Sequence, residues 1–158
     1  MDNETREDLS HEEPVRRRTA REINERIDEA VEKSVRFYAT QSREVISQRI
    51  RELDREWDIE RTLEANAASL TLLGLTGAIF GRRSWLGLPV TVAGFLLMHS
   101  IHGWCPPVPV FRRLGVRTRR EIDREKYALK YLRGDFDHLR KNLSSPERVV
   151  PLVEAVAR

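Results

Sequence analysis

The chain has 158 residues, enough for one modest domain or for a small membrane unit with charged arms. Its charge is segregated: residues 1–64 carry a net charge of -5 and residues 112–158 a net charge of +6, with two uncharged stretches between them. The single cysteine excludes an internal disulfide, and the acidic and polar residues after Met1 predict that there is no cleavable signal peptide.

The N-terminal arm is predicted to contain a disordered tail and one long helix. Residues 1–14 have almost nothing apolar to bury, which is typical of a tail. Residues 15–64 contain no Gly or Pro and repeat apolar residues every three or four positions, so we expect a charged amphipathic helix. A narrow stripe of this kind is typical of a coiled-coil seam, so we expect it to contact a partner chain, with packing inside the chain as the alternative. The seam residues are Ile46, Ile50, Leu53 and Trp57.

The uncharged stretches predict a transmembrane helical hairpin over residues 65–104, with helices at 65–81 and 85–104. Trp85 and Trp104 mark the ends of the second helix, about 28 Å apart, which is close to the ~30 Å hydrocarbon core of a bilayer. Pro89 favours a later start that leaves this helix short, so a soluble helical protein with a buried hairpin is the alternative. Small residues spaced for close helix packing are Gly74, Gly77, Ala78 and Gly81.

Basic residues near the ends of the hairpin predict its orientation. Twelve Arg and Lys residues lie in the flanking segments, whereas Arg82 and Arg83 alone lie in the connecting turn. The positive-inside rule then places both termini in the cytoplasm, in a multi-pass protein of the bacterial inner membrane. Five arginines directly after the second helix are expected to contact lipid headgroups: Arg112, Arg113, Arg117, Arg119 and Arg120. We expect no nucleic-acid binding, because no aromatic residues are interleaved with this run and acidic residues follow it.

Residues 105–158 are predicted to form a basic juxtamembrane segment and short helices. Thr118 and Glu121 form a capping box that starts a helix, and Gly134 is placed to end it. The Ser-Pro-Glu sequence at 145–147 predicts the start of a last, short helix. The predicted fold class is therefore all-α.

The densest chemical cluster is the sequence HSIHGWCPP at residues 99–107. His99 and His102 are three residues apart and share a helix face, and Cys105 follows three residues later. Imidazole and thiolate bind zinc, copper or iron, so these three residues are a candidate metal site. Cys105 alone could also act as a thiol nucleophile or sulfur acceptor. No group that would orient the thiol is evident, so we expect a structural role, no cofactor and no enzyme activity.

The sequence also contains a Gly-x-Cys-Pro element at residues 103–106, after an apolar helix. Upstream lie the Asp54-Arg55 pair and the glycines Gly74 and Gly77, and Gly115 follows. On these residues, positions 54–115 resemble the YgaP-like transmembrane domain family, a small bacterial inner-membrane helical hairpin. Some members are fused to a rhodanese domain and dimerise through the membrane helices. The resemblance implies membrane location and a homodimer, but not sulfurtransferase activity, because this chain has no matching active-site loop.

Two functional hypotheses follow from these observations. The first is a non-enzymatic membrane-anchored scaffold or interaction subunit, whose partners are the lipid bilayer and a second copy or another membrane protein. The second is a membrane thiol or metal protein, a sulfur acceptor or relay, that uses Cys105 with His99 and His102.

Overall fold

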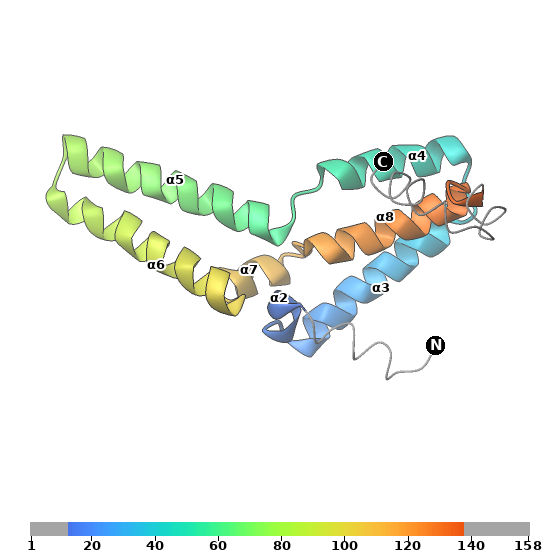
Figure 1. Ribbon diagram of the computed structural model, residues 1–158, viewed down its shortest axis with the longest axis horizontal. Helices are drawn as coiled ribbons and strands as arrows, with labels where there is room; N and C mark the ends of the chain where they lie inside the picture. The colour runs from blue at the N-terminus through green and yellow to red at the C-terminus, as the bar shows by residue number, and fades with distance from the viewer. Residues whose placement is uncertain (1–12, 138–158) are drawn as a thin grey trace, which may run out of the picture. The chain divides into compact units, whose positions relative to one another are not determined.

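The computed structural model describes residues 13–137, which form helices and no β-strand, and this confirms the predicted all-α class (Figure 1). The described residues divide into two compact units. We call residues 13–29 and 57–119 the hairpin unit, and residues 30–56 and 120–137 the bundle unit. In chain order the elements are α2 (Pro14–Arg17), α3 (Arg21–Tyr38), α4 (Arg43–Arg55), α5 (Ile59–Phe80), the 3-10 helix η1 (Arg83–Leu86), α6 (Gly87–His102), α7 (Val108–Arg113) and α8 (Arg119–Arg133).

The single helix predicted over residues 15–64 is wrong, because turns divide this segment into α2, α3, α4 and the start of α5. Capping side chains explain two of the helix starts that were not predicted, those of α4 and α5. The Ser42 hydroxyl accepts a hydrogen bond from the Val45 N–H at the start of α4. The Asp58 carboxylate accepts one from the Arg61 N–H, at 2.8 Å, at the start of α5. Such caps satisfy backbone donors that a helix start leaves free, so they can begin a helix without a Gly or Pro before it.

The core of the bundle unit holds the apolar stripe of α4. Ile46, Ile50 and Leu53 are all at most 5% exposed and form a cluster with Ile122 and Leu129 of α8. The stripe therefore packs inside the chain, which corrects its prediction as a partner seam. Trp57, the fourth predicted seam residue, follows the end of α4, belongs to the hairpin unit and is about half exposed.

A buried ion pair lies beside this apolar core. The Glu125 side chain of α8 is 1% exposed and accepts hydrogen bonds from Arg49 Nε of α4, at 3.0 Å, and from the Ser34 hydroxyl of α3, at 2.6 Å. The carboxylate thus connects three helices of the bundle unit. A second pair joins Lys126 of α8 to Asp54 of α4.

The bounds of α8 agree with the sequence prediction. The helix begins at Arg119, directly after Thr118, and ends at Arg133. Gly134 follows with a φ of +90°, the left-handed conformation that commonly ends a helix. The helix predicted to start at residues 145–147 lies outside the described residues, as does the predicted N-terminal tail except for Glu13 and Pro14.

In the hairpin unit, α5 and α6 contact each other and the turn η1 that joins them (Figure 1). Gly77 of α5 lies against the Trp85 ring, and a Cβ at Gly77 would approach ring atoms to 2.7–2.9 Å. Gly74 lies in the same way against Pro89. Two of the four predicted small residues thus close the hairpin, and Gly81 is the residue that ends α5. The charged residues of α5 lie in its first turns, up to Glu64, and its apolar part follows them.

Candidate functional site at the base of the hairpin

The base of the hairpin, where α5 begins and α6 ends, is held by an apolar cluster. Val15 of α2, Leu63 of α5 and Val108 of α7 are buried there together. The α5 helix is also attached by its backbone, since the Ile59 N–H donates to the Arg117 carbonyl at 2.9 Å. The base therefore joins segments on both sides of the hairpin in the sequence. The buried members of the cluster are Val15, Ile59, Leu63, Cys105 and Val108.

A glycine turn brings α2 to the end of α6. Gly103 has a φ of +67°, and its N–H donates to the His99 carbonyl at 2.7 Å. Pro14 of α2 lies directly against Gly103, where any side chain would collide with it. A left-handed conformation and a close approach both favour glycine at this position.

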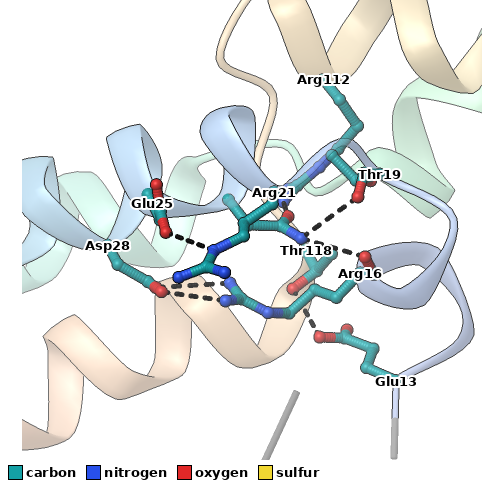
Figure 2. Close-up of polar contacts among 9 residues, drawn as sticks. Glu13, Arg16, Thr19, Arg21, Glu25, Asp28, Arg112 and Thr118 are labelled. Atoms are coloured by element: carbon teal, nitrogen blue, oxygen red, sulfur yellow. Dashed lines mark hydrogen bonds and ion pairs between the residues drawn. The ribbon is translucent and has the colours of Figure 1, made fainter. Parts of the chain in front are cut away.

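Arg112 of α7 belongs to a buried polar cluster (Figure 2). Its side chain has no exposed surface. Arg112 Nη2 donates to Asn24 Oδ1 at 2.8 Å, and Arg112 Nη1 donates to the Val116 carbonyl at 3.2 Å. The Asn24 side chain also donates, through Nδ2, to the Arg16 carbonyl at 3.0 Å. Arg112 and Asn24 together hold α7, the start of α3 and the end of α2 against one another.

A side-chain hydrogen bond and an ion pair anchor α2 on its other sides (Figure 2). The Thr118 hydroxyl, which is fully buried, donates to Glu13 Oε2 at 3.1 Å. Arg16 donates to both carboxylate oxygens of Asp28, at 2.9 and 3.3 Å. The chain before the hairpin is therefore attached both to α3 and to the segment after α7.

The structure corrects one predicted headgroup contact. Arg112 is fully buried, so its prediction as a headgroup ligand is wrong. Arg113, Arg119 and Arg120 are exposed and Arg117 is partly exposed, so for these four the contact stays a prediction. Val108 lies four residues earlier on the same face of α7 and is also fully buried, so this face of the helix points into the hairpin unit.

The predicted metal site is not formed. Among residues 13–137, no three His, Cys, Asp or Glu side chains come together to hold a metal ion, and this includes His99, His102 and Cys105. The reason is the turn at Gly103, which separates the last turn of α6 from Cys105. His102 is exposed, with Nδ1 3.3 Å from the Met98 carbonyl oxygen, whereas Cys105 points into the apolar cluster.

The environment of Cys105 favours a packing role. Its side chain is 2% exposed and belongs to the same cluster as Ile59 and Val108. Burial raises the pKa of the Cys105 thiol, although a hydrogen bond from the Val108 N–H acts in the opposite direction. A raised pKa leaves little of the reactive thiolate near neutral pH.

Two helical stretches among the described residues are long and apolar enough to cross a membrane: Arg43–Phe80 and Arg83–His102. The first stretch is interrupted after Arg55, where α4 ends, and its residues before Ile59 are highly charged. Its apolar part is therefore in α5. Only 17% of the first apolar window and 6% of the second are buried inside the structure. A core helix of a soluble protein is mostly buried, so length, composition and exposure together indicate membrane association for α5 and α6.

Comparisons with known proteins place no further constraint on this site. The chain matches no protein-family model, no curated protein and no solved structure. The identifiable elements of the hairpin unit are a hairpin with exposed apolar side chains and a base fixed by Arg112 and Gly103.

Proposed function

We propose that the chain is an integral membrane protein, in which α5, η1 and α6 form a membrane-inserted hairpin that anchors charged helices at the membrane surface. The main observation behind this proposal is that many apolar side chains of the hairpin are exposed. In water each such side chain costs about 25 cal/mol per Å² of exposed apolar surface, a cost that lipid removes. Six side chains of α5 and α6 are between 63% and 85% exposed: Leu72, Ile79, Phe80, Val90, Leu97 and Ile101.

The positions of all three tryptophans support the same proposal. Trp57 precedes α5, Trp85 lies in η1 between the two helices, and Trp104 follows α6. Tryptophan prefers the interface between hydrocarbon and water, and here it occurs at both ends of the hairpin. The Arg61 guanidinium lies over the Trp57 ring, 4.6 Å from its centroid, which adds a cation beside the ring at the base.

The distribution of basic residues supports a cytoplasmic base for the hairpin. Arg82 and Arg83 are the basic residues of the turn, whereas most Arg and Lys residues near the hairpin lie before α5 or after α6. By the positive-inside rule, both termini would face the cytoplasm and the turn would lie outside. The resemblance of residues 54–115 to the YgaP-like family points to the same bacterial inner-membrane location.

The role proposed for the charged helices is that of a scaffold. The bundle unit exposes Phe37 and Tyr131, at 59% and 66%, among charged residues, and exposed aromatic residues of this kind often contact a partner. The partner would be a second copy of the chain or another membrane protein. Purification of the full chain from membranes in mild detergent, followed by intact-mass measurement, should give a dimer or a hetero-complex. A strictly monomeric mass at micromolar concentration would contradict the scaffold role.

Replacing Leu72 with arginine should reduce membrane integration, whereas the same change at Leu132 should not. Leu72 lies in the middle of the apolar part of α5, where an arginine opposes insertion by about 2.5–3.5 kcal/mol. Leu132 is also an exposed leucine, but it lies on the charged helix α8. The measurement is the fraction of full-length chain that stays in the membrane pellet after extraction with alkaline carbonate.

The two leucine variants also test the soluble alternative. On a soluble protein both substitutions would be harmless surface changes, and the unmodified chain would be released by carbonate. Release of the unmodified chain, or equal behaviour of Leu72→Arg and Leu132→Arg, would overturn the proposed membrane hairpin.

A further inference from the structure

The short helix α7 exposes two large apolar side chains on the face opposite to its packing contacts. Val108 and Arg112 are fully buried and lie four residues apart on one face. Val110 and Leu114 each lie two residues farther along, about 200° around the helix axis, and therefore on the opposite face. They are 55% and 74% exposed. The Leu114 N–H donates to the Val110 carbonyl at 3.1 Å, so the helical backbone continues to Leu114 and holds both side chains on one face.

Both ends of α7 are attached to the first turns of α5. Before α7, Cys105 packs in the apolar cluster with Ile59 and Leu63 of α5. After α7, the Arg117 carbonyl accepts the hydrogen bond from the Ile59 N–H at 2.9 Å. The α7 helix therefore lies across the base of the hairpin, at the level of the first turns of α5 and just before the apolar part that follows Glu64 (Figure 1).

The sequence around this level contains residue types that are typical of a membrane surface. Trp57 lies two residues before α5 begins, and Trp104 lies four residues before α7 begins. Tryptophan prefers the interface between hydrocarbon and water. Residues 105–120 contain five arginines and no acidic residue, and among them Arg113 is exposed next to Leu114. An anionic lipid surface attracts a basic segment of this kind.

We propose that α7 is an interfacial helix that inserts Val110 and Leu114 between the headgroups and acyl chains of the membrane. This inference rests on the proposed membrane insertion of the hairpin. Interfacial helices place apolar side chains in lipid and keep their cations at the headgroups. Lipid fits this face better than a protein partner does, because the exposed apolar surface of α6 continues into its last turn, where Ile101 is 67% exposed. A membrane that covers Ile101 extends to the base of the hairpin, where α7 lies.

Spin labelling of the full chain in vesicles of phosphatidylglycerol and phosphatidylcholine tests the proposal. Nitroxide labels are attached to Val110→Cys and Leu114→Cys, and power saturation compares their collisions with oxygen, which enters lipid, and with a nickel chelate, which stays in water. Both labels should lie in lipid at a depth of about 5–10 Å, shallower than a label on Leu72→Cys in the middle of α5. Leu132→Cys is the matched control, because Leu132 is an exposed leucine on the charged helix α8, and its label should collide with the chelate. The native Cys105 is 2% exposed and should take up no label; if it does, the variants are made with Cys105→Ala.

Two results at positions 110 and 114 would overturn the interfacial helix. Collisions with the chelate as frequent as at position 132 would place this face of α7 in water. Exclusion of both oxygen and the chelate would mean that protein, and not lipid, covers it. The label at position 72 separates this inference from the proposed function. If that label collides with the chelate, the membrane hairpin itself is wrong; if it lies in lipid and the labels at 110 and 114 do not, only the interfacial helix is wrong.

Discussion

Replacing Arg49 with methionine should reduce the free energy of unfolding of the bundle unit by about 3–5 kcal/mol. The substitution leaves the Glu125 carboxylate, which is 1% exposed, without the guanidinium that lies 3.0 Å away. The Ser34 hydroxyl still donates to this carboxylate, but a buried charge that loses its guanidinium is more destabilising than the loss of an exposed ion pair. Chemical denaturation of the full chain, followed by circular dichroism, measures the change.

A matched control and a double variant make this test specific. Arg51 lies on the same helix but is exposed, so Arg51→Met should change stability by less than about 0.5 kcal/mol. Combining Arg49→Met with Glu125→Leu should restore stability to within about 1 kcal/mol of the unmodified chain, because both charges then leave the interior. Similar losses in Arg49→Met and Arg51→Met, or no recovery in the double variant, would show that the buried pair does not determine the stability of this unit.

Replacing Arg112 with alanine should reduce the free energy of unfolding of the hairpin unit by about 3–5 kcal/mol. The change removes the donors to Asn24 Oδ1 and to the Val116 carbonyl and leaves a cavity in a fully buried position. Because Asn24 also binds the Arg16 carbonyl, α2 should become accessible to protease before the rest of the unit unfolds. Unfolding in detergent micelles by titration with SDS, together with limited proteolysis, measures both effects.

Two further variants separate the geometry of Arg112 from its charge. Arg113 is the exposed neighbour, so Arg113→Ala removes the same charge from the chain and should have little effect. Lysine at position 112 keeps the charge but has one compact donor group in place of a planar fork, so it should recover only part of the stability. Full recovery with lysine would mean that charge alone matters, and equal losses at positions 112 and 113 would contradict the buried cluster.

The fold class and the apolar helices could be predicted because both depend on local composition. The ends of these helices were predicted less accurately than their positions in the chain. Asp58 caps α5 inside charged sequence, so the helix begins before the predicted residue 65, and the left-handed Gly103 ends α6 before Trp104. Uncharged composition indicates which residues could lie in lipid, but hydrogen bonds at the helix ends decide where the helices start and stop.

The stripe of α4 was predicted with three correct residues and the wrong partner. Periodicity identifies which face of a helix is apolar, but it does not identify what covers that face. Here Ile122 and Leu129, which lie in α8 far along the chain, cover Ile46 and Ile50. The same limit explains the missed role of Arg112. Arg112 and Arg113 are identical in type, and only Asn24, 88 residues earlier in the chain, distinguishes them.

The candidate metal site failed for a different reason. Spacing of three residues places side chains on one face only while the helix continues, and Gly103 stops α6 between His102 and Cys105. The glycine was visible in the sequence, but its left-handed conformation and its contact with Pro14 depend on how α2 folds back.

The equal lengths of the two apolar segments have a consequence for the surrounding lipid. The part of α5 after Glu64 and the whole of α6 each contain about 16 residues, or about 24 Å of helix, which is roughly 6 Å less than a typical hydrocarbon core. Lipids adapt to such a mismatch by shortening around the protein, at a fraction of a kcal/mol for each Å. In the proposed insertion, a ring of thinned bilayer would therefore surround each hairpin. Merging two rings reduces the deformed area, so the membrane itself would draw copies of the chain together and favour the thinnest membranes of the cell.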